Sequence, residues 1–168
     1  IDYRIFGILL LDEDSGLLEM KVAIKYGDDP RAINPMKLGE GLVGYAALHK
    51  EVVLVPDVTR DPRYIHAVPG VRSELVVPLM LKDRCIGVFD LESPERDAFN
   101  KKHVKLLTLL ASEAAVAIEN ARLYESIRAS EARFEKELRF AQRVQMALLP
   151  QELPKRLRGV DVAWHFDP

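Results

Sequence analysis

Cysteine is nearly absent from this chain, and its scarcity limits the chemistry that the chain can perform. The sequence has 168 residues and a single cysteine, Cys85. One cysteine excludes an internal disulfide, a zinc site built from several cysteines and a dithiol redox pair. The same scarcity is typical of a reducing setting inside the cell. We therefore expect a cytoplasmic protein.

A strong net charge and a long apolar run are also missing. The formal net charge is −2 and the isoelectric point is near 6.1, so nothing attracts nucleic acid or anionic lipid. No apolar stretch is long enough to span a bilayer, and no signal-peptide pattern begins the chain. We expect neither nucleic acid nor a membrane among the partners. With 48% apolar and 30% charged residues, the composition is that of a globular protein.

Glycine and proline are absent between Pro94 and Pro150, which predicts a long helix. Its first half carries one stripe of apolar and small residues in steps of three and four: Leu107, Leu110, Ala114, Ala117, Ala121 and Tyr124. The stripe then resumes in a shifted frame, the pattern of a stammer, through Ile127, Glu131, Phe134, Leu138, Ala141, Gln145 and Leu148. Beyond Tyr124 a lone helix has little to bury this stripe against. We therefore expect a parallel homodimer along a seam from Tyr124 through Leu148.

Short β-strands precede this helix. The residues predict strands over 3–11, 17–25, 52–55, 73–81 and 85–91, an extended piece over 36–38 and a helix over 42–49. The first strand is apolar on both faces and is expected to be central. Residues 92–100 are expected to form a polar linker that ends at Asn100, the helix cap. The sum is an α+β fold, a small antiparallel sheet with flanking helices and a long C-terminal coiled-coil helix.

A long irregular connection over residues 57–70 is the candidate ligand-binding segment, because connections of this length on compact domains are often functional. Tyr64, His66 and Arg72 could provide stacking and anion contacts to a small molecule. A lone histidine on a loop is more often solvated than bound to a ligand, and Tyr64 and Arg72 could equally pin the loop to the sheet. No catalytic residues and no metal ligands are predicted, and the sequence leaves any cofactor unknown.

Several segments in the same order resemble a GAF domain: residues 38–44, 55–58, 61–64, 73–79, 86–93 and 107–124. The resemblance implies a PAS-related sensory fold, a pocket for a small ligand and dimerisation through terminal helices. The helix that usually precedes the first strand is absent. The expected organisation is a GAF domain over residues 1–124, a helical coiled-coil linker over 125–149 and the start of another domain over 150–168.

A shorter resemblance covers residues 137–150, Pro154, residues 159–163 and Pro168. It is similar to the beginning of a bacterial metal-dependent serine/threonine phosphatase domain of the stress-response and sporulation type. The metal-binding carboxylates of that family lie after this point. The resemblance therefore implies a phosphatase output domain in the same chain and no enzymatic activity in this fragment.

The sequence thus predicts a regulatory GAF module that binds a small ligand or mediates dimerisation, and that signals through the helix to a phosphatase. Two alternatives remain open. One is the effector-binding domain of a transcriptional regulator, and the other is a small-molecule enzyme that uses the GAF pocket. Against the enzyme, GAF relatives that reduce free methionine sulfoxide use several cysteines, and this chain has only Cys85.

Overall fold

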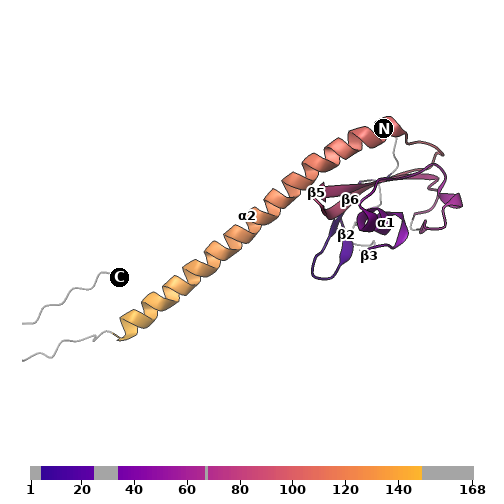
Figure 1. The fold of residues 1–168 in the computed structure, drawn as a ribbon. Helices are drawn as coiled ribbons and strands as arrows, with labels where there is room; N and C mark the ends of the chain where they lie inside the picture. Colours follow the sequence, from indigo (N-terminus) through magenta and orange to yellow (C-terminus); the bar gives the residue numbers. More distant parts are fainter. Residues whose placement is uncertain (1–4, 25–33, 67, 149–168) are drawn as a thin grey trace, which may run out of the picture. The chain divides into compact units, whose positions relative to one another are not determined.

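A six-stranded antiparallel sheet is the centre of the structure (Figure 1). The computed structural model describes residues 5–24, 34–66 and 68–148. The order of the strands is β3-β2-β1-β6-β5-β4, which confirms both the α+β class and the central position of β1. The strands are β1 (Ile5–Leu11), β2 (Leu17–Ile24), β3 (Met36–Lys37), β4 (Val53–Val55), β5 (Ser73–Leu81) and β6 (Arg84–Ser93).

The first hairpin is closed by local hydrogen bonds of Asp12. The backbone N–H of Ser15 donates to Asp12 Oδ1 at 2.8 Å, and the N–H of Asp12 donates to the carbonyl of Leu17 at 2.9 Å. Gly16 has a φ of 68°, which costs glycine little because it has no Cβ. These bonds set the register that pairs Leu11 with Leu18.

Strand β6 is longer than the sequence predicts. We expected it to end at Leu91 and a polar linker to begin at Glu92, but β6 continues through Ser93. Glu92 pairs with Glu74 of β5, and Ser93 pairs with Ser73. Polarity was a poor guide here because the carboxylate of Glu92 is buried rather than solvated.

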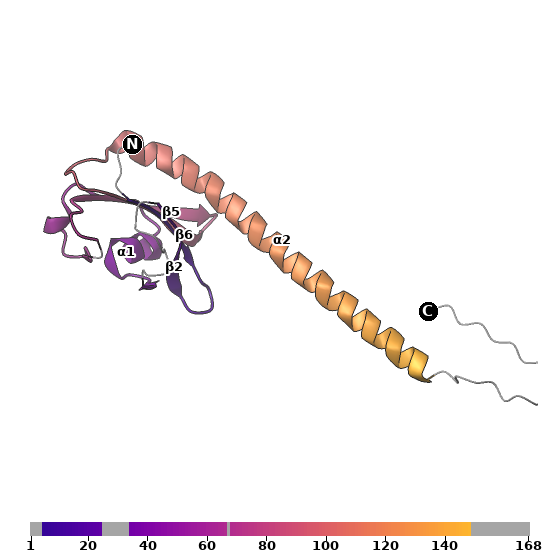
Figure 2. The same ribbon diagram turned by 180° about the vertical axis from the view of Figure 1, so that it is seen from behind.

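Each face of the sheet is covered by a helix, α1 (Gly41–His49) on one side and the first turns of α2 (Lys101–Leu148) on the other (Figures 1 and 2). On the α1 face, Leu42, Val43, Ala46 and Ala47 pack in one cluster with Leu9, Leu18, Val76 and Val88. On the α2 face, Leu107, Ala111 and Ala115 pack with Leu75, Val77, Leu79, Ile86, Phe89 and Leu91. Because strand side chains alternate between the two faces, each central strand contributes to both cores.

Two local features fix the helices. A Cβ added to Gly44 would lie 2.3 Å from the carbonyl oxygen of Lys37, so only glycine lets α1 approach β3 this closely. Asn100 caps α2 as predicted, since its Oδ1 accepts from the N–H groups of Lys102 at 2.9 Å and His103 at 3.2 Å. These bonds satisfy donors that a helix start otherwise leaves unpaired.

The connection after β4 is held by ion pairs and hydrogen bonds within itself and by an ion pair to Arg96, which follows β6. It contains one short helical turn, η2 (Val58–Arg60). The carboxylate of Asp57 lies 3.1 Å from Arg96 and accepts from the Thr59 hydroxyl at 2.7 Å. Asp61 pairs with Arg63 at 2.6 Å.

Helix α2 crosses two compact units, residues 1–119 and 120–168. The prediction that the stripe from Leu107 forms a single face of the helix is wrong in the first unit. Leu107 is buried against the sheet, whereas Leu110 is exposed. In the second unit every side chain described from 120 to 147 is exposed or partly exposed. None of the described helices is long and apolar enough to cross a membrane.

Candidate functional site

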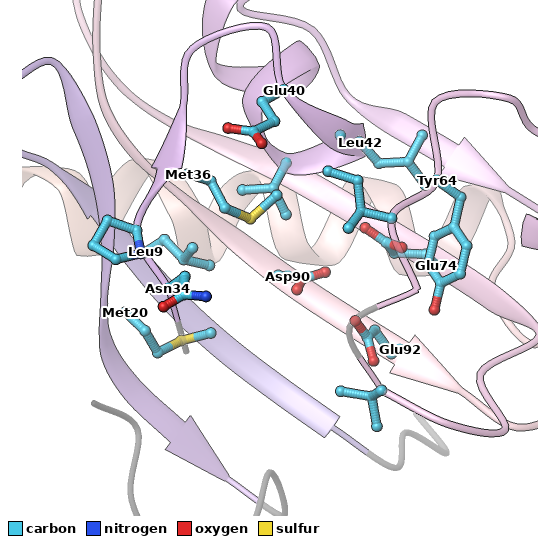
Figure 3. Close-up of a pocket in the computed structure, with 15 residues that line it drawn as sticks. Leu9, Met20, Asn34, Met36, Glu40, Leu42, Tyr64, Glu74, Asp90 and Glu92 are labelled. Carbon is cyan, nitrogen blue, oxygen red and sulfur yellow. The ribbon is translucent and has the colours of Figure 1, made fainter. Parts of the chain in front are cut away.

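A pocket of about 460 Å³ lies between the α1 face of the sheet, the start of α1 and the connection after β4 (Figure 3). This volume falls within the range of small-molecule sites. Most of its wall is apolar, from Leu9, Met20, Met36, Leu42, Val43, Ile65 and Val68. The remaining lining residues include Asn34, Glu40, Tyr64 and three buried acids, and among the described residues no lysine or arginine lines it.

The three acids are Glu74, Asp90 and Glu92, and they form one cluster on the sheet (Figure 3). Glu74 lies directly opposite Glu92 in the β5–β6 pairing, and Asp90 precedes Glu92 by two residues on the same face. Their side chains are only 3%, 3% and 4% exposed. One carboxylate oxygen from each lies within 4.8 Å of the others. We call this group the acidic triad.

Burial and mutual repulsion dominate the electrostatics of the triad. The pKa of Glu74 is raised well above its usual 4.5, first because burial disfavours the charged carboxylate and then because of the negative charges of Asp90 and Glu92. A hydrogen bond with Asp90 raises it further. Three adjacent carboxylates cannot all ionise cheaply in a buried site. The triad therefore favours binding of a proton or of another cation.

Tyr64 forms the side of the pocket next to the triad (Figure 3). Burial and then the charges of Glu92, Glu74 and Asp90 raise the pKa of Tyr64, so its hydroxyl stays protonated and can donate a hydrogen bond. This buried hydroxyl has no hydrogen-bond partner among the described residues. Such an atom is normally satisfied, and a ligand in the pocket could provide the acceptor.

The amino-terminal end of α1 forms another wall, through Gly41, Leu42 and Val43. No side chain caps this end, because the Glu40 carboxylate accepts from the backbone N–H of Lys37 at 2.9 Å instead. The first N–H groups of a helix lack partners within the helix, and its dipole favours negative charge there. The pocket therefore has an acidic patch and, on another wall, a helix end that suits an anion.

The structure separates the three predicted ligand-binding residues. Tyr64 lines the pocket, whereas His66 and Arg72 do not belong to its lining. His66 is exposed and packs edge-on against the Tyr64 ring, with 4.8 Å between ring centroids. Arg72 is exposed, and its backbone N–H donates to the carbonyl of Ser93 at 2.8 Å. Binding by these three residues stays a prediction.

The acidic triad is the part of the site that sequence reasoning missed. Asp90 and Glu92 stand two positions apart in an otherwise apolar run, and Glu74 interrupts another such run. The sequence did indicate this cluster, because Asp90 and Glu92 share one face of an apolar strand. The sequence alone could not show that the two runs pair with Glu74 opposite Glu92, since that depends on register.

Cys85, the single cysteine, is the second residue of β6 and is not part of the pocket lining. Its thiol is buried and donates to the carbonyl oxygen of Gly87, with 3.1 Å between sulfur and oxygen. Burial raises the pKa of the Cys85 thiol, which keeps it in the unreactive protonated form.

Comparison with known proteins places residues 1–119 in a family whose description is GAF domain. A GAF domain-containing protein A of Dictyostelium discoideum is 33% identical over 79 residues, which are 47% of this chain and 50% of that protein. A free methionine-R-sulfoxide reductase of Saccharomyces cerevisiae is 33% identical over 81 residues, 48% of this chain and 45% of the relative. The chain thus spans about half the length of these curated relatives.

Solved structures show the same similarity. A free methionine-R-sulfoxide reductase from Neisseria meningitidis, in complex with its substrate, is 29% identical with a TM-score of 0.67, and the match covers 73% of this chain and 71% of that one. The type II enzyme from Thermoplasma acidophilum is 28% identical with a TM-score of 0.64, over 70% of this chain and 80% of that one.

These similarities overturn the expectation that the fragment has no enzymatic activity. That expectation rested on the missing phosphatase carboxylates and the single cysteine, yet relatives that share this domain are reductases in their own right. The phosphatase resemblance falls after the family match and in part on residues outside the described part of the chain, so it stays a prediction. The family model, the sheet order and the similar structures agree, and the chain belongs to the GAF domain family.

Proposed function

We propose that this domain binds a free amino acid of the methionine sulfoxide class in its pocket and acts on it as a small-molecule reductase. The observation that carries the proposal is the acidic triad, three buried carboxylates in the wall of a largely apolar cavity. Similarity to free methionine-R-sulfoxide reductases supports the choice of substrate class.

A primary ammonium fits the triad in charge and in number of donors. It carries one positive charge and three N–H groups, and Glu74, Asp90 and Glu92 each offer one oxygen within a span of 4.8 Å. Charge-assisted hydrogen bonds to buried carboxylates are among the stronger polar contacts in proteins. Because burial and the neighbouring charges raise the pKa of Glu74, binding of the ammonium would favour release of a proton from this carboxyl group.

The rest of the pocket suits the other parts of such a molecule. The uncapped start of α1 at Gly41 and Leu42 offers N–H donors for the α-carboxylate. Met20, Met36 and Val68 provide an apolar wall for the thioether arm. The Tyr64 hydroxyl is a donor for a substrate oxygen, such as that of the sulfoxide.

The reaction needs a reductant from outside the pocket. Reduction of the sulfoxide consumes two electrons and two protons, breaks the S–O bond, and yields the thioether and water. A dithiol supplies both electrons and both protons by closing to a disulfide. Cys85 cannot serve as that dithiol alone and lies outside the pocket lining, so the proposal requires an external dithiol.

Calorimetric titration of the chain with L-methionine-R-sulfoxide tests the binding step. We expect saturable binding that Glu92→Gln weakens by at least ~10-fold, since one charge-assisted contact is lost. N-acetylmethionine sulfoxide, which has no ammonium, is the matched control and should not bind. Absence of binding by the free amino acid at millimolar concentration would contradict the proposal.

Turnover is tested separately, with dithiothreitol as the dithiol and methionine measured by chromatography. Free methionine should appear only with both protein and dithiol present, and Glu92→Gln should slow it. Cys85→Ser should leave the rate unchanged, because the proposed electrons come from the external dithiol.

Ligand sensing through the same pocket is the second candidate function. The position of Cys85 favours it, because the described pocket holds groups that bind an amino acid but no thiol. Saturable binding without formation of methionine would select sensing over reduction. Coupling of such sensing to a phosphatase through α2 stays a prediction that the full-length protein must test.

A further inference from the structure

Gly7 leaves a gap in the row of side chains that β1 places on the pocket face of the sheet. Alternate residues of a strand share a face, and the neighbours of Gly7 on this face, Ile5 and Leu9, are both buried in the cluster that packs with α1. Strand β1 is paired on both of its sides. Glycine weakens such a strand, because it has no side chain to pack and loses more conformational freedom on folding than other residues do. A glycine at such a place often marks the close approach of another group.

Met20 of β2 occupies the gap over Gly7. A Cβ built on Gly7 would lie 3.0 Å from the Sδ of Met20 and 3.0 Å from its Cε, whereas carbon atoms normally pack about 3.5–4.0 Å apart. Met20 pairs with Leu9, so its side chain reaches along the strand to the Gly7 position. The next atom, Leu9 Cδ1 at 3.7 Å, would be in ordinary contact. The end of Met20 is thus the group that depends on the missing side chain of Gly7.

This gap lies beside the acidic triad. Gly7 pairs with Asp90 in the β1–β6 ladder, and Ile5 pairs with Glu92. Residues directly opposite each other in an antiparallel pair have their Cβ positions about 4.5–5.5 Å apart. Met20 and Asp90 both line the pocket (Figure 3), whereas Gly7 itself does not. The thioether of Met20 therefore forms the part of the pocket wall next to Asp90.

We propose that Gly7 and Met20 together set the size of the amino acid side chain that fits beside the triad. This role rests on the proposed function, because it takes the ammonium of the ligand to bind at Glu74, Asp90 and Glu92. With glycine at position 7, the Met20 thioether lies against the strand and leaves room in front of it. The pocket then accepts an unbranched side chain of about the length of that of methionine.

A side chain at position 7 would push the Met20 thioether into the pocket. The strand lies behind the thioether and Leu9 lies beside it, so the cavity is the side toward which it can move. Methionine is unbranched and flexible, and an added methyl group that meets only its far end costs the fold little. Gly7→Ala should therefore reduce the pocket without unfolding the domain, and Met20→Ala should enlarge it.

Calorimetric titration with unbranched amino acids of increasing size measures this effect. L-norvaline, L-norleucine and L-2-aminooctanoate carry the same ammonium and carboxylate, and each buried methylene group strengthens binding by ~4-fold. Gly7→Ala should lower the affinity for norleucine relative to norvaline by at least ~3-fold, because the larger side chain loses its place first. Met20→Ala should raise the affinity for 2-aminooctanoate relative to norleucine by ~10-fold, because the additional methylene groups become buried.

Two further variants separate the role of Met20 from other effects of the substitution. In a Met20→Ala background, Gly7→Ala should leave both affinity ratios within ~2-fold, because no thioether remains to be displaced. Val22→Ala changes the same strand as Met20, but Val22 pairs with Ile8, which packs on the α2 face. This variant should leave the ratios unchanged. Urea unfolding confirms that each variant is folded.

NMR of the chain labelled with carbon-13 in its methionine methyl groups observes the displacement without a ligand. Four methionine signals are expected, and the signal that disappears in Met20→Ala should move in Gly7→Ala. An unmoved Met20 signal, or equal losses of affinity for norvaline and norleucine in Gly7→Ala, would overturn this role and leave the proposed function intact. If the parent chain bound none of these amino acids, the proposed function would fail as well.

Discussion

Replacement of Glu74 by glutamine should stabilise the empty domain and at the same time weaken its pocket. Glu74 is buried beside Asp90 and Glu92, and its pKa is raised mainly by burial and then by their charges. In the unfolded chain the same group titrates near its usual 4.5. Between that value and the folded pKa, the folded state binds the proton that the unfolded state has lost.

The sign of the pH dependence follows from this difference. Because the folded state holds more protons in that window, the free energy of unfolding falls as pH rises, by up to about 1.4 kcal/mol per pH unit. A glutamine amide can still donate to Asp90 but does not titrate. The stability difference between Glu74→Gln and the parent should therefore grow with pH at up to that slope, in favour of the variant.

Urea unfolding monitored by circular dichroism from about pH 5 to pH 8 measures this slope. Glu51→Gln is the control, since Glu51 is exposed and its replacement should leave the pH dependence unchanged. Parallel stability curves for Glu74→Gln and the parent would refute the assignment of a buried, protonated Glu74.

Binding of an ammonium ligand should respond in the opposite sense. The parent must release the Glu74 proton to bind, so its affinity should rise with pH by up to about tenfold per unit in the same window. Glu74→Gln should bind more weakly and lose this slope, as titration calorimetry at several pH values can show. If the affinity of the parent were independent of pH, the triad would not be the ammonium site.

Three further substitutions test the scaffold and the pocket wall. Gly44→Ala should destabilise the domain by about 1–3 kcal/mol in urea unfolding, because the new methyl group collides with the carbonyl of Lys37. Asn100→Ala should cost about 1 kcal/mol in the same assay through loss of the bond from the Lys102 N–H, and Asn100→Asp should restore it. Tyr64→Phe should reduce ligand affinity by about 3–10-fold in calorimetry with little change in unfolding, since only an unpartnered hydroxyl is removed.

Local patterns were sufficient where a structure depends on neighbouring residues. The cap at Asn100 was predicted, because it is fixed by residues within a few positions. The central position of β1 followed from apolar residues on both of its faces. The motifs over residues 38–93 likewise predicted the GAF fold that the family match confirms.

The candidate site was predicted only in part. Tyr64 was named because it lies on a long connection, and it does line the pocket. His66 and Arg72 were named for the same reason, but a side chain on an irregular segment can point either way. The proposed class of ligand was chosen from the charge of the acidic triad. In the sequence the three acids of the triad are separate and do not identify themselves as one site.

Tertiary structure alone decided two features of this protein. Pairing of β5 with β6 brought Glu74 opposite Glu92, and a slip of one residue would have turned these carboxylates to the other face. Packing of α2 on the sheet assigned Leu107 to the domain core and left Leu106 and Leu110 exposed. The sequence by itself determined the elements and their amphipathic patterns, because these depend on local spacing. Contacts between segments far apart in the chain decide which charges lie together and which apolar face of a helix stays exposed.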